Sequence, residues 1–145
     1  MNKNKLFSYT IMFIGIVMIL LGTRWMIVDE PWMLDEVANI ERLEMTFEEL
    51  FNEKVNKTLP GYLRQIYRFF GYWVITIGLF ITFFSTPKLI ESYDIRKRLL
   101  ICLGFMMFLG TTLGHTLIPS SHFIYLIWIM NALYLFCISQ HKKIT

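Results

Sequence analysis

Four uncharged, hydrophobic runs alternate with polar segments along the 145-residue chain. Each run contains no Asp, Glu, Lys or Arg and is 18 to 20 residues long. Because an α-helix rises about 1.5 Å per residue, a run of this length crosses a hydrocarbon core about 30 Å thick. The pattern predicts four transmembrane helices, at about 6–23, 69–86, 99–118 and 122–140.

The segment between the first two runs, at about 29–68, has the pattern of short helices. Thr46 and Glu49 fit a capping box, and apolar residues with helical spacing follow them. A shorter helix is expected after Pro31, and Pro60 is expected to end the second helix. The two form a short amphipathic hairpin, which is too small for a core of its own and must rest on the bundle or the lipid.

Composition excludes a soluble domain, because 55% of the residues are hydrophobic and the mean hydropathy is +0.49. We therefore expect an all-α fold in which residues 1–145 form a single membrane domain, a four-helix transmembrane bundle. The net charge of +3 comes from basic residues that flank the runs, where lipid head groups and topology explain them. The lipid bilayer is thus the expected partner, and nucleic acid is not.

The distribution of charge predicts the orientation, since cytoplasmic segments retain Lys and Arg during insertion. The N-terminus, second loop and C-terminus together carry eight basic residues and two acidic ones, whereas the first loop carries nine acids. The eight are Lys3, Lys5, Lys88, Arg96, Lys97, Arg98, Lys142 and Lys143. Both termini are therefore expected to be cytoplasmic, and the hairpin extracytoplasmic.

Glycines recur at spacings of seven or four residues, which return a helix to nearly the same face. Such faces allow two helix backbones to approach closely, so these glycines are expected to pack helices together. They are Gly15 and Gly22, Gly71 and Gly78, and Gly110 and Gly114.

Three polar residues are expected near the middle of the membrane. Counted from the outer edge, Thr76, Thr111 and Asn131 all lie about 10 to 12 Å deep. An amide facing lipid is costly, so Asn131 should point inward to Thr76, Thr111 or Tyr134. We expect these side chains to form a polar layer.

His115 lies about 5 Å below the outer edge and is the centre of a predicted outer vestibule. It serves either as a structural hydrogen-bond donor beneath the hairpin or as part of a binding site. Charged residues are expected to gather above it, namely Arg24, Asp29, Glu30, Asp35, Glu36, Arg64 and Arg68. The sequence has no metal-ligand spacing and no paired redox cysteines, so no catalytic residue, metal or cofactor is assigned.

The order of the parts resembles the small four-helix bacterial membrane proteins grouped around DoxX, and their relatives of unknown function. The parts are Pro31-Trp32 in the outer segment, Arg68-Phe69-Phe70-Gly71 at the entry to the second helix, the basic loop, the Gly-rich third helix and the Pro119 turn. The resemblance implies a multi-pass protein of the bacterial cytoplasmic membrane. It also implies an accessory subunit, because some DoxX-like proteins belong to oxidoreductase complexes that handle quinones or thiols.

Three functions remain open from the sequence. The first is a non-catalytic accessory or binding subunit whose outer hairpin engages a membrane-protein partner, a second copy of the chain or a lipid-like ligand. The second is a small membrane enzyme or quinone-linked redox subunit that uses the His115 vestibule. The third is a minimal transporter that acts as an oligomer.

Overall fold

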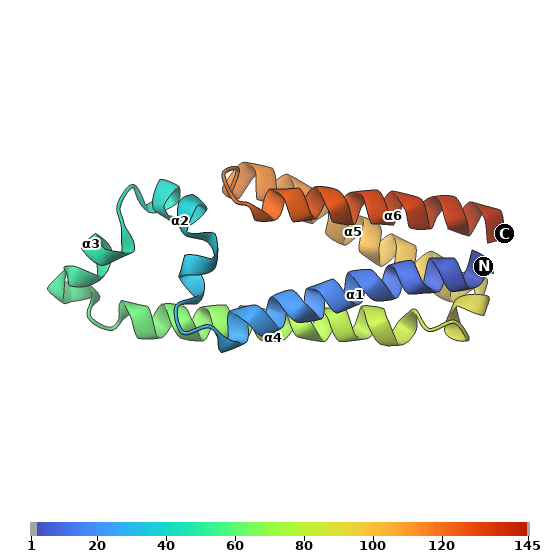
Figure 1. Ribbon diagram of the computed structural model, residues 1–145, viewed down its shortest axis with the longest axis horizontal. Coiled ribbons are helices and arrows are strands. Elements are labelled where there is room, and N and C mark those ends of the chain that lie inside the picture. The colour runs from blue at the N-terminus through green and yellow to red at the C-terminus, as the bar shows by residue number, and fades with distance from the viewer. Residues whose placement is uncertain (1–2, 145) are drawn as a thin grey trace.

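The computed structural model describes residues 3–144, which are mostly helical and contain no strand. Four of the helices are long and apolar enough to cross a membrane. They are α1 (Lys3–Ile27), α4 (Leu59–Phe84), α5 (Tyr93–Leu117) and α6 (Phe123–Ile144). The predicted fold class, an all-α four-helix bundle, is confirmed, and the chain is a multi-pass integral membrane protein. Its two ends lie at the same end of the bundle (Figure 1), which we call the terminal end.

Two of the long helices extend well beyond the uncharged runs. α4 begins at Leu59, ten residues before the predicted span, and Pro60 lies in its first turn. The expectation that Pro60 ends a helix is wrong, because proline needs no hydrogen-bond donor at a helix start and is favoured there. α5 begins at Tyr93 after an N-cap at Ser92, whose hydroxyl accepts from the backbone N–H of Ile95. Charged and polar residues thus continue each helix past the hydrocarbon core.

The segment from 31 to 56, which we call the lid, is a chain of short helices beyond the far end of the bundle (Figure 1). Its elements are η1 (Pro31–Asp35), α2 (Glu36–Leu43), α3 (Phe47–Asn52) and η2 (Lys54–Asn56). The capping box at the start of α3 is present, with Thr46 and Glu49 each accepting from the other's backbone N–H. The backbone N–H and the hydroxyl of Thr46 both donate to the Glu49 carboxylate, and these two bonds hold the pKa of Glu49 below its usual value.

Glycines bring α1 and α4 into close contact along their length. A Cβ added to Gly78 would lie 2.7 Å from the carbonyl oxygen of Gly15, and a Cβ on Gly15 would lie 2.8 Å from that of Gly78. In the same way, a Cβ on Gly22 would lie 2.5 Å from the carbonyl oxygen of Gly71, and a Cβ on Gly71 would lie 2.6 Å from that of Gly22. Any larger side chain at these four positions would push the two backbones apart.

The glycines of α5 do not make such a contact. A Cβ on Gly110 would meet no heavy atom within 4 Å, and one on Gly114 would meet only the side-chain ends of Ile124 and Ile127. The packing role expected of Gly110 is therefore wrong, because side chains and not backbones separate α5 from α6. Gly110 instead lines a pocket of about 160 Å³ among methionines of α1, α5 and α6.

The helices pack in the spatial order α4, α1, α6, α5. α1 contacts α4 and α6, and α6 contacts α5, so each neighbouring pair is well packed. α4 and α5 follow each other in the chain, joined through η3 (Leu89–Glu91), yet they barely touch. The bundle is thus open along one side.

The terminal end of the bundle is closed by a buried arginine. Arg96 of α5 is only 4% exposed and donates through Nη1 to the carbonyl oxygens of Ile90 and Glu91, at 2.7 and 3.0 Å. Its Nε donates to Nδ1 of His141 on α6, at 3.4 Å. At the same end, Ser8 of α1 is fully buried, and its hydroxyl donates to the carbonyl oxygen of Ser85, the residue after α4. These bonds tie the α4–α5 connection to α6 and α1.

Candidate ligand pocket beneath the lid

The structure does not bring the predicted vestibule residues into contact with His115. This side chain is exposed, with Nδ1 2.9 Å from the carbonyl oxygen of Thr111 in the preceding turn. Its ring meets that of Trp128 on α6 edge to face, with centroids 5.7 Å apart. Within residues 3–144, the hydrogen bond and ring contact of His115 are thus with α5 and α6, and not with the charged residues that we expected around it.

The other vestibule residues are distributed around the outer end of the molecule. Asp35 lies beside a different histidine, with Oδ1 3.4 Å from Nδ1 of His122. Arg64 donates through Nε to the backbone carbonyl of Asp29, at 2.7 Å. The remaining four are exposed and make no side-chain hydrogen bond or ion pair with residues 3–144, namely Arg24, Glu30, Glu36 and Arg68.

The lid is fastened to the bundle by Arg42 of α2. Its Nη2 donates to the carbonyl oxygen of Thr116 at 2.8 Å, and its Nε donates to that of Leu117. Both acceptors lie in the last turn of α5, where carbonyl groups lack partners within the helix and the helix dipole is negative. Arg42 therefore caps α5 and holds α2 above it.

Aromatic rings form a small core inside the lid. Trp32 is 2% exposed and packs against Phe47 and Phe51, with ring centroids 6.2 and 5.4 Å apart. Asn39 holds the backbone of Trp32 in place, because its Nδ2 donates to the Trp32 carbonyl oxygen at 2.7 Å. The same amide lies 3.3 Å from the hydroxyl of Tyr67, which joins the lid to α4.

A pocket of about 320 Å³ lies between the lid and the outer part of α4. It is within the size range of pockets that bind small molecules. Most of its lining is apolar, and the polar side chains are Asn39, Arg42 and Tyr67. The complete lining consists of Trp32, Asn39, Arg42, Leu43, Phe47, Leu50, Leu59, Leu63 and Tyr67.

The pocket has the chemistry of a site for an amphipathic molecule. Leucine and phenylalanine side chains offer it an apolar body, and Tyr67 and Asn39 offer hydrogen-bonding groups. Only Nε and Nη2 of Arg42 bond to carbonyl oxygens, so the guanidinium keeps free donors for a polar or anionic head group. These lining residues can bind such a molecule through apolar contacts and hydrogen bonds.

Two of the three residues predicted near the membrane midplane meet each other. Asn131 of α6 donates from Nδ2 to Oγ1 of Thr111 on α5, at 2.9 Å, and also to the carbonyl oxygen of Ile127. Thr76 does not join them, because it lies on α4 and donates to the carbonyl oxygen of Tyr72 in its own helix. The polar layer is therefore a single link between α5 and α6.

Searches against protein-family models, curated proteins and solved structures find no match. Within residues 3–144, no group of three or more His, Cys, Asp and Glu side chains lies close enough together to hold a metal ion. The geometry of the pocket is therefore the basis for any functional conclusion.

The sequence did not single out Arg42, Asn39 and Tyr67 as site residues. Arg42 carried a usable signal, since it is a lone cation among the acids of α2. Asn39 and Tyr67 carried none, because they are 28 residues apart and meet only through the path of the lid.

Proposed function

We propose that this protein is a non-catalytic membrane subunit that binds a lipid-like, amphipathic ligand beneath its outer lid. The observation that carries the proposal is the pocket of about 320 Å³, which is apolar apart from Asn39, Arg42 and Tyr67. Such a site selects a molecule with an apolar chain and one polar or anionic head group. The redox alternative, which uses the His115 vestibule, gains no support, since the contacts of His115 among the described residues are with Thr111 and Trp128 and not with the charged residues expected around it.

The expected setting is the bacterial cytoplasmic membrane, with the lid on its outer side. The charge distribution and the DoxX-like order of parts support this setting and an accessory role beside a larger membrane complex. The pocket would then open at the level of the outer leaflet, where a lipid-like ligand can enter from the bilayer or from the lid side.

Calorimetric titration of dodecanoate into the full chain, held in nanodiscs of zwitterionic lipid, tests the proposal. Empty nanodiscs supply the blank for partitioning into lipid. We expect saturable binding of one dodecanoate per chain and weaker binding of dodecylamine, because the charged group in the pocket is the guanidinium of Arg42.

Leu63→Trp should fill the pocket and weaken dodecanoate binding about tenfold, as overpacking of about 1–3 kcal/mol implies. Gln65→Trp is the matched control, because Gln65 is exposed on the same helix and does not line the pocket. Binding equal to the blank, or equal losses in both variants, would overturn the proposal.

A further inference from the structure

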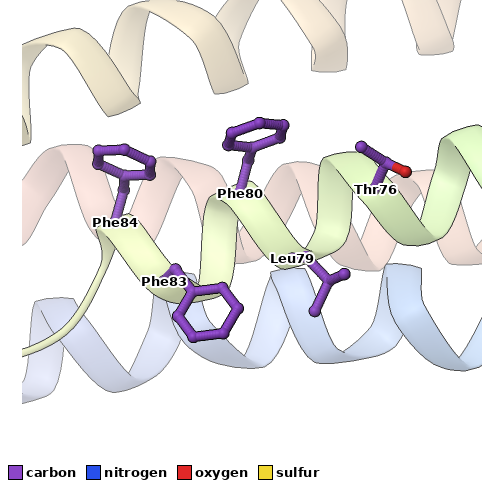
Figure 2. Close-up of a pocket in the computed structure, with 5 residues that line it drawn as sticks. All are labelled: Thr76, Leu79, Phe80, Phe83 and Phe84. Carbon is purple, nitrogen blue, oxygen red and sulfur yellow. The ribbon is translucent and has the colours of Figure 1, made fainter.

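Two adjoining pockets that share Phe84 form a groove on the side of the bundle where α4 and α5 barely touch. Figure 2 shows Thr76, Phe80 and Phe84 on one side of α4, at successive turns. The rings of Phe80 and Phe84 are stacked with centroids 6.3 Å apart, and the two side chains are 60% and 49% exposed. This apolar face of α4 has no helix covering it in residues 3–144.

At its terminal end the groove continues onto α5. Phe84 also lines a second pocket, of about 210 Å³, together with Ile95, Leu99 and Cys102 of α5. Arg98 is the only charged residue in the lining of either pocket. The guanidinium makes no hydrogen bond or ion pair with the described residues, and it lies directly before the apolar run of α5. Arg98 therefore offers a positive charge at the terminal end of an apolar groove.

We propose that this groove binds one anionic phospholipid, with its phosphate on Arg98 and an acyl chain along Phe84 and Phe80. The site lies at the opposite end of the membrane from the pocket beneath the lid and does not depend on the function proposed there. Charge decides the occupant, because an anionic head group complements Arg98, the charged residue in the lining.

The depth of the groove fits a lipid of one leaflet. Phe84 and Thr76 are eight residues apart on α4, which is about 12 Å along the helix axis. Each leaflet contributes about half of a hydrocarbon core about 30 Å thick. An acyl chain that starts beside Arg98 therefore follows the α4 face over most of its own leaflet.

The test measures lipid retention by native mass spectrometry of the full chain purified from membranes and exposed to phosphatidylglycerol or phosphatidylcholine. We expect one retained phosphatidylglycerol, and its apparent affinity should fall about fivefold in Arg98→Gln. Lys97→Gln removes the same charge from the adjacent exposed residue, which does not line the groove, and should leave retention unchanged.

A second pair of variants tests the acyl-chain part of the site. Cys102→Trp fills the groove and should abolish retention of phosphatidylglycerol, whereas Ile101→Trp places the same bulk on an exposed position beside it. Equal retention of phosphatidylcholine and phosphatidylglycerol, or equal effects of Arg98→Gln and Lys97→Gln, would overturn the proposal. So would an oxidative dimer through Cys102 in intact membranes, because a second copy would then occupy the groove.

Discussion

Replacing Gly78 by alanine tests whether backbone contact holds α1 against α4. The new Cβ would lie 2.7 Å from the Gly15 carbonyl oxygen and 3.0 Å from the Ile19 backbone nitrogen. Ordinary contacts of this kind are longer, and both neighbours are backbone atoms that cannot rotate away. The two helices must therefore separate, and the packing that α1 and α4 share along their length is weakened.

The size of the effect follows from two opposing terms. Overpacking of this kind costs about 1–3 kcal/mol, while alanine is favoured over glycine in a helix by about 1 kcal/mol. Gly110→Ala is the matched control, because its Cβ meets no atom within 4 Å and only the favourable term remains. The free energy of unfolding should therefore be about 1–3 kcal/mol lower for Gly78→Ala than for Gly110→Ala.

The assay is reversible unfolding by SDS in mixed micelles, followed by the loss of helical circular dichroism. Both variants change one hydrogen to a methyl group, so differences in micelle partitioning cancel. If the two variants unfold at the same SDS fraction, the close approach of α1 and α4 does not stabilise the protein.

Three further predictions follow from other parts of the molecule. Arg96→Met should lower the free energy of unfolding by about 1–3 kcal/mol in the same assay, since it leaves the Ile90 and Glu91 carbonyls without their donor; exposed Lys97→Met should change it by less than about 0.5 kcal/mol. Because the pKa of Glu49 is lowered from 4.5, its contribution to lid stability is present above that pH and is lost as the pH falls through the lowered pKa. The protection of the α3 amides, taken relative to the intrinsic exchange rate at each pH, should fall there, but not in Glu49→Gln. A reporter fused after residue 143 should be active in the cytoplasm, and external activity would refute the assigned orientation.

The four spans were predictable because an uncharged run of 18 to 20 residues has few alternatives to crossing a membrane. The capping box at Thr46 was predictable because its bonds are local. The ends of α4 and α5 were not, since charged residues can continue a helix beyond the lipid. Pro60 shows this most clearly, because its sequence neighbourhood does not distinguish the end of one helix from the start of the next.

The site was less predictable than the spans, because it depends on which residues the lid brings together. His115 and His122 both lie near the outer end, and only the fold pairs Asp35 with His122. Tryptophan is common at membrane interfaces, yet Trp32 is buried against Phe47. In a helix that is apolar all round, spacing alone does not show which face meets a neighbour, and for this reason Gly110 was assigned to the wrong kind of contact.

The lid is hydrogen-bonded to two helices, α4 and α5, that scarcely contact each other. Arg42 is bonded to the end of α5, and Asn39 reaches Tyr67 on α4. The contact between α1 and α6 joins the α4–α1 pair to the α6–α5 pair on one side, and the lid joins the outer ends of α4 and α5 on the other. A change in the distance that the lid spans between α4 and α5 therefore changes the angle between the two helix pairs. The width of the open side that faces the lipid changes with that angle.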